Sequence, residues 1–135
     1  MRLPIIYIAG AISGETLTFL RNIREGNKLA ERVLATGKAA PFNPFQDWMY
    51  EMFGDHEVQT YYNFSLAFLR ISDIMIIRRE GAKRSKGTMA EIDEARRLGI
   101  IYFYDDQWDE FLIALDKAYQ FQNTRLKSGA EVLDD

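Results

Sequence analysis

Short apolar runs that alternate with longer helix-like segments constrain this chain more than any other feature of its sequence. The runs fall at 5–9, 38–42, 73–77 and 100–104. Apolar residues recur at helical spacing over about 16–35, 61–72, 88–98 and 108–121. A β-α-β-α-β-α-β-α chain predicts a parallel sheet covered by helices on both faces. We therefore expect an α/β three-layer sandwich of the flavodoxin or Rossmann type, with four or five parallel strands.

One of the four runs belongs at the edge of that sheet. The run 38–42 is short and contains Pro41, which lacks the N–H that a central strand needs for pairing. In parallel sheets of this type, ligands bind outside the carboxyl ends of the strands, where the strand order reverses. We expect the loops after the first and third runs, 10–14 and 78–87, to flank that point.

Length and charge narrow the classes of function. The chain has 135 residues, of which 47% are hydrophobic and 27% charged, and this predicts one globular domain at 1–121 with a polar tail at 122–135. The net charge of −3 argues against binding to a nucleic acid polymer, which favours a basic surplus. The apolar run at the N-terminus is too short for a signal peptide or a membrane span, so we expect a cytoplasmic protein without membrane association.

Residue usage argues against several further chemistries. With no cysteine, the sequence offers no disulfide, no thiol nucleophile and no cysteine-ligated zinc. A single histidine, His56, argues against a histidine-built metal site and against a serine–histidine triad. Since the carboxylates are not grouped at ligand spacings either, we predict neither a metal nor a cofactor.

The segment around the third run carries the main chemical signal. The run 73–77 leads into a basic, glycine-containing loop and then into a helix expected over 88–98. A serine, a glycine and the first amides of a helix, at the carboxyl end of a strand, form an anion-binding site. The residues with these properties are Ser85, Gly87 and Thr88. Glu91 lies beside the apolar stripe of that helix, where a carboxylate can point at the bound group, although a glutamate taken alone is more often a solvated helix residue.

The loop after the first run is a second candidate for ligand binding. It consists of Gly10, Ala11, Ile12, Ser13 and Gly14. Its two glycines permit a tight turn and a close approach of the backbone to a ligand. The match to a dinucleotide fingerprint is loose, because the third glycine and the acidic residue after a second strand are missing. A small-ligand loop and a plain β–α turn both fit this stretch.

An aromatic segment follows the second run. Residues 45–62 are rich in aromatic side chains and methionine. Such a segment can form a lid over a flat ligand or pack at a subunit contact, and the sequence leaves both interpretations open. We expect His56, which lies within the segment, at the surface.

The order of these motifs resembles the nucleoside 2-deoxyribosyltransferase superfamily. That superfamily includes nucleoside deoxyribosyltransferases, nucleoside 5′-monophosphate N-glycosidases and small uncharacterised members, to which the chain is most similar. The resemblance covers roughly 5–104. It rests on the order and spacing of Tyr7 to Gly14, Asn43-Pro44, Asp73, Ser85-x-Gly87-Thr88-x-x-Glu91 and Ala95-x-x-Leu98-Gly99.

The resemblance implies cleavage of the N-glycosidic bond of a nucleoside or nucleoside 5′-monophosphate, by hydrolysis or by base exchange. Glu91 stands at the position of the family's nucleophile, which attacks the anomeric carbon and forms a glycosyl-enzyme. Tyr7 matches the tyrosine that orients the nucleophile, and Ser85 matches the serine that contacts a 5′-phosphate. A hydroxyl beside cationic side chains suits a phosphate, which favours a nucleotide. The further substrate-binding residues implied are Gly10, Ala11, Ile12, Ser13, Gly14, Asn43, Ser65, Gly87 and Thr88.

Two positions depart from the family pattern. Ser65 stands where the family has an aspartate that helps handle the leaving base or the sugar, and Ser13 stands where monophosphate glycosidases tend to have an arginine. Two alternatives therefore stay open: a non-catalytic nucleotide-binding module of the same fold, and an interaction protein that uses the segment 45–62. The resemblance also implies a homodimer or larger homo-oligomer whose subunits complete each other's sites.

Overall fold

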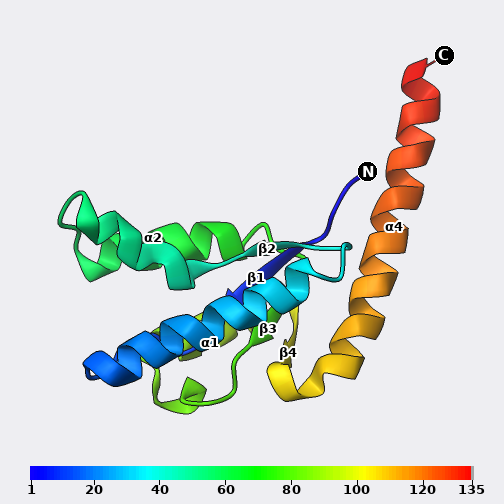
Figure 1. Ribbon diagram of the computed structural model, residues 1–135. Coiled ribbons are helices and arrows are strands. Elements are labelled where there is room, and N and C mark those ends of the chain that lie inside the picture. The colour runs from blue at the N-terminus through cyan, green and yellow to red at the C-terminus, as the bar shows by residue number, and fades with distance from the viewer. Residues whose placement is uncertain (135) are drawn as a thin grey trace.

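The computed structural model of the chain describes the backbone of residues 1–134 and the side chains of residues 1–124. As predicted, it is an α/β structure in which parallel strands form one sheet flanked by helices (Figure 1). The strands are β1 (Ile5–Ala9), β2 (Ala40–Phe42), β3 (Ile74–Ile77) and β4 (Ile101–Tyr104). The α-helices are α1 (Thr16–Leu34), α2 (Val58–Leu69), α3 (Lys86–Leu98) and α4 (Trp108–Asp134). Short 3-10 segments are η1 (Pro44–Met52), η2 (Ala82–Arg84) and η3 (Asp105–Gln107).

The strand order is β2-β1-β3-β4, so the order reverses between β1 and β3. All three ladders are parallel, and Tyr7 in β1 lies opposite Phe42 on one side and Met75 on the other. β2 takes the edge position that its proline predicts. The loops after β1 and β3 therefore flank the point where the strand order reverses, as expected from the alternation of elements.

The two faces of the sheet follow from the alternation of side chains along β1 and β3. Even-numbered residues of both strands pack with α1 and α4, and odd-numbered residues pack with α2 and α3. The first cluster consists of Ile6, Ile8, Leu29, Ala30, Val33, Ala39, Phe45, Ile74, Ile76, Phe111 and Leu115. The second cluster consists of Tyr7, Ala9, Leu69, Met75, Ile77, Ala82, Ile92 and Ala95. Tyr7 thus belongs to the face that carries α3.

Asp73 fixes the start of the two central strands. Its Oδ2 accepts a hydrogen bond from the Ile5 N–H at 2.7 Å, and the Asp73 N–H donates to the Ile5 carbonyl at 2.8 Å. This reciprocal pair sets the register of β1 against β3. The two strands therefore end side by side, and the loops that follow them begin at the same edge of the sheet.

Several helix ends differ from those that the sequence predicts. α1 begins at Thr16, with Glu15 as its N-cap, and ends at Leu34, one residue before the predicted end. α2 spans 58–69, an earlier segment than predicted, which leaves Ile71 beyond its end and exposed. α3 begins at Lys86 rather than at 88. The last difference matters for the site, because it moves the free amides of the helix closer to the loop.

The last helix exceeds its predicted length. The apolar spacing predicts a helix only over 108–121 with a loose polar tail, but the backbone of α4 stays helical to Asp134. Figure 1 shows its C-terminal half, orange to red, extending away from the sheet. The side chains from residue 125 onward, and with them a role of this tail in an oligomer contact, lie outside the described residues. Within those residues, no helix combines the length and the apolarity that crossing a membrane requires.

Candidate functional site

A cavity of about 700 Å³ opens beyond the carboxyl ends of β1, β2 and β3. Its volume is within the range of small-molecule binding sites. Its walls come from the loop after β1, the start of α1, η1, α2, and the loop after β3 together with the start of α3. The cavity therefore lies where the reversal of strand order predicts a ligand.

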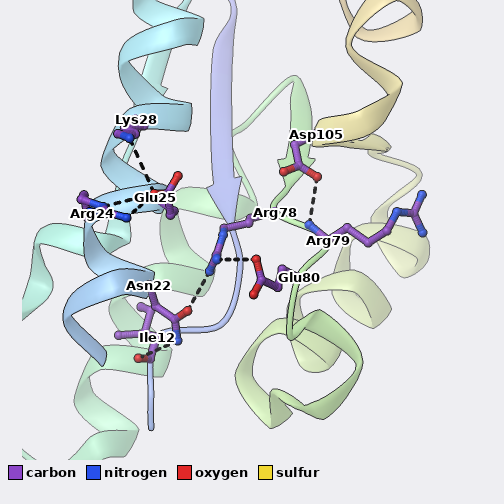
Figure 2. Close-up of polar contacts among 9 residues, drawn as sticks. All are labelled: Ile12, Asn22, Arg24, Glu25, Lys28, Arg78, Arg79, Glu80 and Asp105. Atoms are coloured by element: carbon purple, nitrogen blue, oxygen red, sulfur yellow. Dashed lines mark hydrogen bonds and ion pairs between the residues drawn. The ribbon is translucent and has the colours of Figure 1, made fainter. Parts of the chain in front are cut away.

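A buried arginine fixes the loop after β1. Arg78 directly follows β3, and its Nη1 donates a hydrogen bond to Asn22 Oδ1 at 2.7 Å (Figure 2). Asn22 Nδ2 in turn donates to the Ile12 carbonyl at 3.3 Å. Arg78 Nη2 donates to Glu80 at 3.0 Å, which compensates the buried charge. The two loops are thus tied together through contacts that the sequence pattern does not indicate.

The hydroxyl of Ser85 caps α3 and keeps one proton free for a ligand. Ser85 Oγ accepts hydrogen bonds from the Thr88 N–H at 3.2 Å and from the Thr88 hydroxyl at 2.9 Å. Because both lone pairs are occupied, the Ser85 O–H is the remaining donor, and it lies in the cavity wall. The N–H groups of Lys86 and Gly87 are the first two of α3, which a helix leaves without an intrahelical acceptor. Together these donors favour an anion.

The basic residues around this loop divide into two groups. The Arg79 side chain forms an ion pair with Asp106. The Arg79 backbone N–H donates a hydrogen bond to Asp105 at 3.0 Å (Figure 2), so Arg79 is engaged with the segment after β4. Arg84 and Lys86 instead line the cavity as exposed side chains. An anion at the start of α3 would therefore meet two cations that are not committed to an ion pair among the described residues.

Glu91 projects from α3 toward Tyr7 of β1. Glu91 Oε2 and the Tyr7 hydroxyl are both buried, and within the described residues neither atom has a hydrogen-bond partner of full geometry. Burial raises the pKa of Glu91 to about 8; the nearby Tyr7 hydroxyl counteracts part of this rise, and the charge of Asp47 adds to it. Burial also raises the pKa of Tyr7, so its hydroxyl stays protonated and can donate to the carboxylate.

A second carboxylate, which the sequence motifs do not indicate, faces the same cavity. Asp47 belongs to η1, and the Ser65 hydroxyl donates to its Oδ2 at 3.5 Å. Burial raises the pKa of Asp47 to about 6, and the Ser65 hydroxyl reduces this rise. Asp47 is hidden within the aromatic segment 45–62. The signal that could have found it is a carboxylate shortly after the Asn43-Pro44 turn, at the carboxyl end of a parallel strand.

The ring of Phe45 anchors η1 and with it Asp47. Asn43 Oδ1 accepts a hydrogen bond from the Phe45 N–H at 3.1 Å and so caps the segment. The buried Phe45 ring packs so closely on α1 that a Cβ on Gly26 would lie 2.3 Å from it. A Cβ on Gly10 would lie 3.0 Å from the same ring. The absence of side chains at Gly10 and Gly26 therefore leaves room for the Phe45 ring, which holds η1 beside the point where the strand order reverses.

The aromatic segment forms one wall of the cavity. Trp48, Tyr61 and Tyr62 line it. The Tyr61 hydroxyl donates to Glu51 Oε1 at 2.5 Å, and this bond joins α2 to η1. These three residues form part of the cavity wall, and both interpretations of the segment, a lid over a flat ligand and a subunit contact, stay predictions.

The structure brings most of the predicted site residues together. The predicted residues that line the cavity are Gly10, Ala11, Ile12, Ser13, Ser65, Ser85, Gly87, Thr88 and Glu91. Tyr7 lies beneath the cavity, fully buried in the sheet. Asn43 lines a separate hollow beside β2, where its Nδ2 donates to Asn27 Oδ1 at 2.6 Å. Gly14 packs beside Thr18 at the start of α1. These last two residues therefore support the walls rather than line them.

The described residues contain no group of three histidine, aspartate or glutamate side chains that could hold a metal ion. Comparisons with protein-family models, with curated proteins and with solved structures find no match for this chain. What the site does must therefore be argued from its own geometry.

Proposed function

We propose that the protein cleaves the N-glycosidic bond of a nucleoside 5′-monophosphate, or of a nucleoside, through a covalent glycosyl-enzyme formed on Glu91. One observation carries the proposal: Glu91, whose Oε2 is buried without a hydrogen-bond partner of full geometry among the described residues, lies in the same cavity as the free N–H groups at the start of α3. Water as the acceptor makes the reaction a hydrolysis, and a second base makes it a base exchange.

The start of α3 binds the 5′-phosphate in this proposal. The Ser85 hydroxyl and the N–H groups of Lys86 and Gly87 supply hydrogen bonds, and the Arg84 side chain supplies positive charge. From Lys86 to Glu91 the helix rises roughly 7.5 Å. This spacing is comparable to the span of a furanose ring with its 5′-methylene. A phosphate at the helix start therefore brings the anomeric carbon within reach of Glu91.

Glu91 reacts in its ionised form. The transition state of glycosidic cleavage has oxocarbenium character, and a carboxylate in a poorly hydrated site stabilises that positive charge strongly. Because the pKa of Glu91 is raised to about 8, the ionised fraction in the free protein grows as the pH rises toward 8. The Tyr7 hydroxyl beside the carboxylate supports the ionised form.

The aromatic wall receives the base. Trp48, Tyr61 and Tyr62 offer flat apolar surface on the side of the cavity formed by η1 and α2. Stacking of a heterocyclic base on such rings depends little on its hydrogen-bonding edges. Preference among bases therefore needs polar groups in addition to this wall.

A base-release assay tests the proposal. Purified protein is incubated with a panel of nucleosides and their 5′-monophosphates, and free base is separated by chromatography. Glu91→Gln is compared with Glu94→Gln, a matched control in α3 whose carboxylate pairs with Arg70 and Arg97 outside the cavity. We expect release by the wild type and by Glu94→Gln, and a loss of roughly 10³-fold or more in Glu91→Gln.

The same panel separates the alternatives. Release that does not depend on Glu91 contradicts the proposed nucleophile. A thermal shift with nucleotides but no release over long incubation favours the nucleotide-binding module. Absence of both release and binding leaves the interaction protein as the better account.

A further inference from the structure

The cavity holds two partly buried carboxylates, and the proposed cleavage step uses only one of them as nucleophile. Glu91 comes from α3 and Asp47 from η1, so they enter from different walls. The charge of Asp47 raises the pKa of Glu91, which shows that the two groups lie within electrostatic reach. Between about pH 6 and about pH 8 the pair holds one proton, which lies mostly on Glu91 because its pKa is the higher of the two. The less populated arrangement, with Glu91 ionised and the proton on Asp47, has the same total charge and is in equilibrium with it.

The surroundings of Asp47 leave its protonated form accessible. No lysine or arginine among the described residues forms an ion pair with Asp47. Its only recorded side-chain partner is Ser65 in α2, at the 3.5 Å limit of a hydrogen bond. The other titratable or charged groups in or beside this cavity are Tyr7 in β1, Arg21 in α1, Glu51 in η1, Tyr61 and Tyr62 in α2, Glu80 and Arg84 after β3, and Lys86 and Glu91 in α3.

This inference rests on the proposed function. We infer that Asp47 is the catalytic acid and base of the cleavage: it protonates the departing base and later accepts a proton from the attacking water. Asp47 is anchored for this role, because Phe45, two residues before it, is locked against Gly10 and Gly26. Ser65 then acts as a positioning residue, since its hydroxyl holds one oxygen of Asp47 at the cavity wall.

The two half-reactions balance. A Glu91 oxygen forms a bond to the anomeric carbon while the C–N bond breaks. The electron pair of the C–N bond passes to the base, and the base takes the proton of the Asp47 carboxyl. The products are the free base, a glycosyl ester on Glu91 and an Asp47 carboxylate. Water then attacks the anomeric carbon, gives its proton to Asp47 and displaces Glu91. Both side chains return to their starting forms, with no other reactant required.

A matched control for Asp47 lies outside the cavity. Asp55 follows η1 within the aromatic segment 45–62, is exposed, and is not among the residues that line the cavity. Asp55→Asn therefore makes the same change of side chain and charge in the same segment, without altering the cavity wall.

The experiment compares two leaving groups on the same sugar phosphate. One substrate is a deoxynucleoside 5′-monophosphate that the wild type cleaves, and the other is 4-nitrophenyl 2-deoxyribofuranoside 5-phosphate, whose nitrophenolate departs without a proton. We expect Asp47→Asn to lose roughly 10²- to 10⁴-fold in kcat on the nucleotide and only a few-fold on the nitrophenyl compound. Glu91→Gln should lose both activities, and Asp55→Asn should keep both.

The pH dependence supplies a second readout. The wild type should show a bell-shaped rate profile on the nucleotide, because one carboxyl must be ionised while the other is protonated. On the nitrophenyl substrate the alkaline limb should disappear. Ser65→Ala should move the Asp47 limb to higher pH, because the Ser65 hydroxyl holds the pKa of Asp47 down.

Each outcome decides between the two claims. If the wild type cleaves neither substrate, the proposed function fails and this inference fails with it. If the wild type is active and Asp47→Asn cleaves the nucleotide at an undiminished rate, the assignment of Asp47 is overturned while the role of Glu91 stands. If Asp47→Asn loses both substrates equally, Asp47 serves the architecture of the cavity, and its role in proton transfer is likewise overturned.

Discussion

The two faces of the sheet are built from the same two strands and yet have opposite characters. The face under α1 and α4 is closed mainly by aliphatic and aromatic side chains, and the buried Arg78 and Asn22 beside it form a hydrogen bond with each other. The face under α2 and α3 contains the Tyr7 hydroxyl and, beside its apolar cluster, the Glu91 carboxylate, and neither is fully satisfied by a partner among the described residues. The face under α1 and α4 stabilises the fold, whereas the buried polar atoms on the face under α2 and α3 lower the free energy of unfolding where that face meets the cavity.

This difference indicates where the chemistry of the molecule lies. A buried polar atom without a partner costs free energy of folding, so it persists only where another requirement keeps it. Of the three buried side-chain atoms without a partner among the described residues, the Tyr7 hydroxyl and Glu91 Oε2 lie at or beneath the cavity, where the topology predicts a ligand, and the third, Gln122 Oε1, lies on α4. Substitutions on the two faces should therefore change the free energy of unfolding with opposite signs.

The largest expected effect is on the apolar face. Phe111 is fully buried, and its ring contacts those of Phe103 and Trp108 at centroid distances of 6.3 and 5.1 Å. Phe111→Ala should destabilise the protein by about 3–5 kcal/mol, because it removes apolar contacts and leaves a cavity. Urea unfolding followed by circular dichroism measures this change. A loss below about 1 kcal/mol would show that this face does not carry the stability of the fold.

An intermediate effect of opposite sign is expected at Glu91. Its pKa is near 8 in the folded protein against 4.5 for the free group, so the unfolded chain releases the proton first and stability falls as pH rises through this window. The full pKa shift corresponds to about 4–5 kcal/mol, and solvent at the half-buried side chain screens part of it. Glu91→Gln should therefore stabilise the protein by on the order of 2–3 kcal/mol at pH 8, and by little below pH 4.5. Unfolding curves at both pH values measure the difference.

The control for this prediction is Glu94, three residues further along α3. Hydrogen bonds from Arg97 and Arg70 lower the pKa of Glu94 to about 2, with Arg97 making the larger contribution. Its contribution to stability is therefore present above pH 4.5 and is lost as the pH falls toward 2. Glu94→Gln should show no gain at pH 8. Equal behaviour of the two variants would contradict the contrast between a buried and an ion-paired carboxylate.

The smallest stability effect is expected at Tyr7. Tyr7→Phe removes a buried hydroxyl that has no hydrogen bond of full geometry, so stability should change by about 1 kcal/mol or less, in the direction of a gain. Base release should nevertheless fall. With the nitrophenyl substrate, whose cleavage needs only ionised Glu91, the acid limb should move to higher pH, because Tyr7 counteracts the raised pKa of Glu91. Rate profiles and unfolding curves of the same preparation separate the two effects. A large loss of stability would show that the hydroxyl is structural.

Much of the fold could be predicted because it depends on local patterns. The continuous apolar runs predict strands buried on both faces, and Pro41 predicts the edge position of β2. Ser85 and Glu91 could be selected because helix starts and strand ends have recognisable residues. Their meeting with the loop after β1 follows from the alternation of elements alone.

The missed features depend on contacts between segments that are distant in the sequence. Asp47 enters the cavity because Phe45 fits between Gly10 and Gly26, a packing detail that no periodicity reports. In the sequence, Arg78 looks like one of several basic residues in a loop. Its hydrogen bond to Asn22 joins the loop after β3 to α1, which the local pattern does not indicate. The aspartate expected at position 65 is absent there, and a carboxylate from a different element lies next to the serine that replaces it.

The account depends most directly on a covalent bond between Glu91 and the sugar. A deoxynucleoside 5′-monophosphate that carries fluorine at C2′ of the sugar slows both the formation and the hydrolysis of the glycosyl-enzyme, because the fluorine destabilises the cationic transition states. The intermediate can therefore accumulate. The measurement is the intact mass of the treated protein, followed by peptide mapping. The account predicts one added sugar phosphate on the peptide that contains Glu91, and none in Glu91→Gln. Base release without an adduct, or an adduct on another residue, would contradict it.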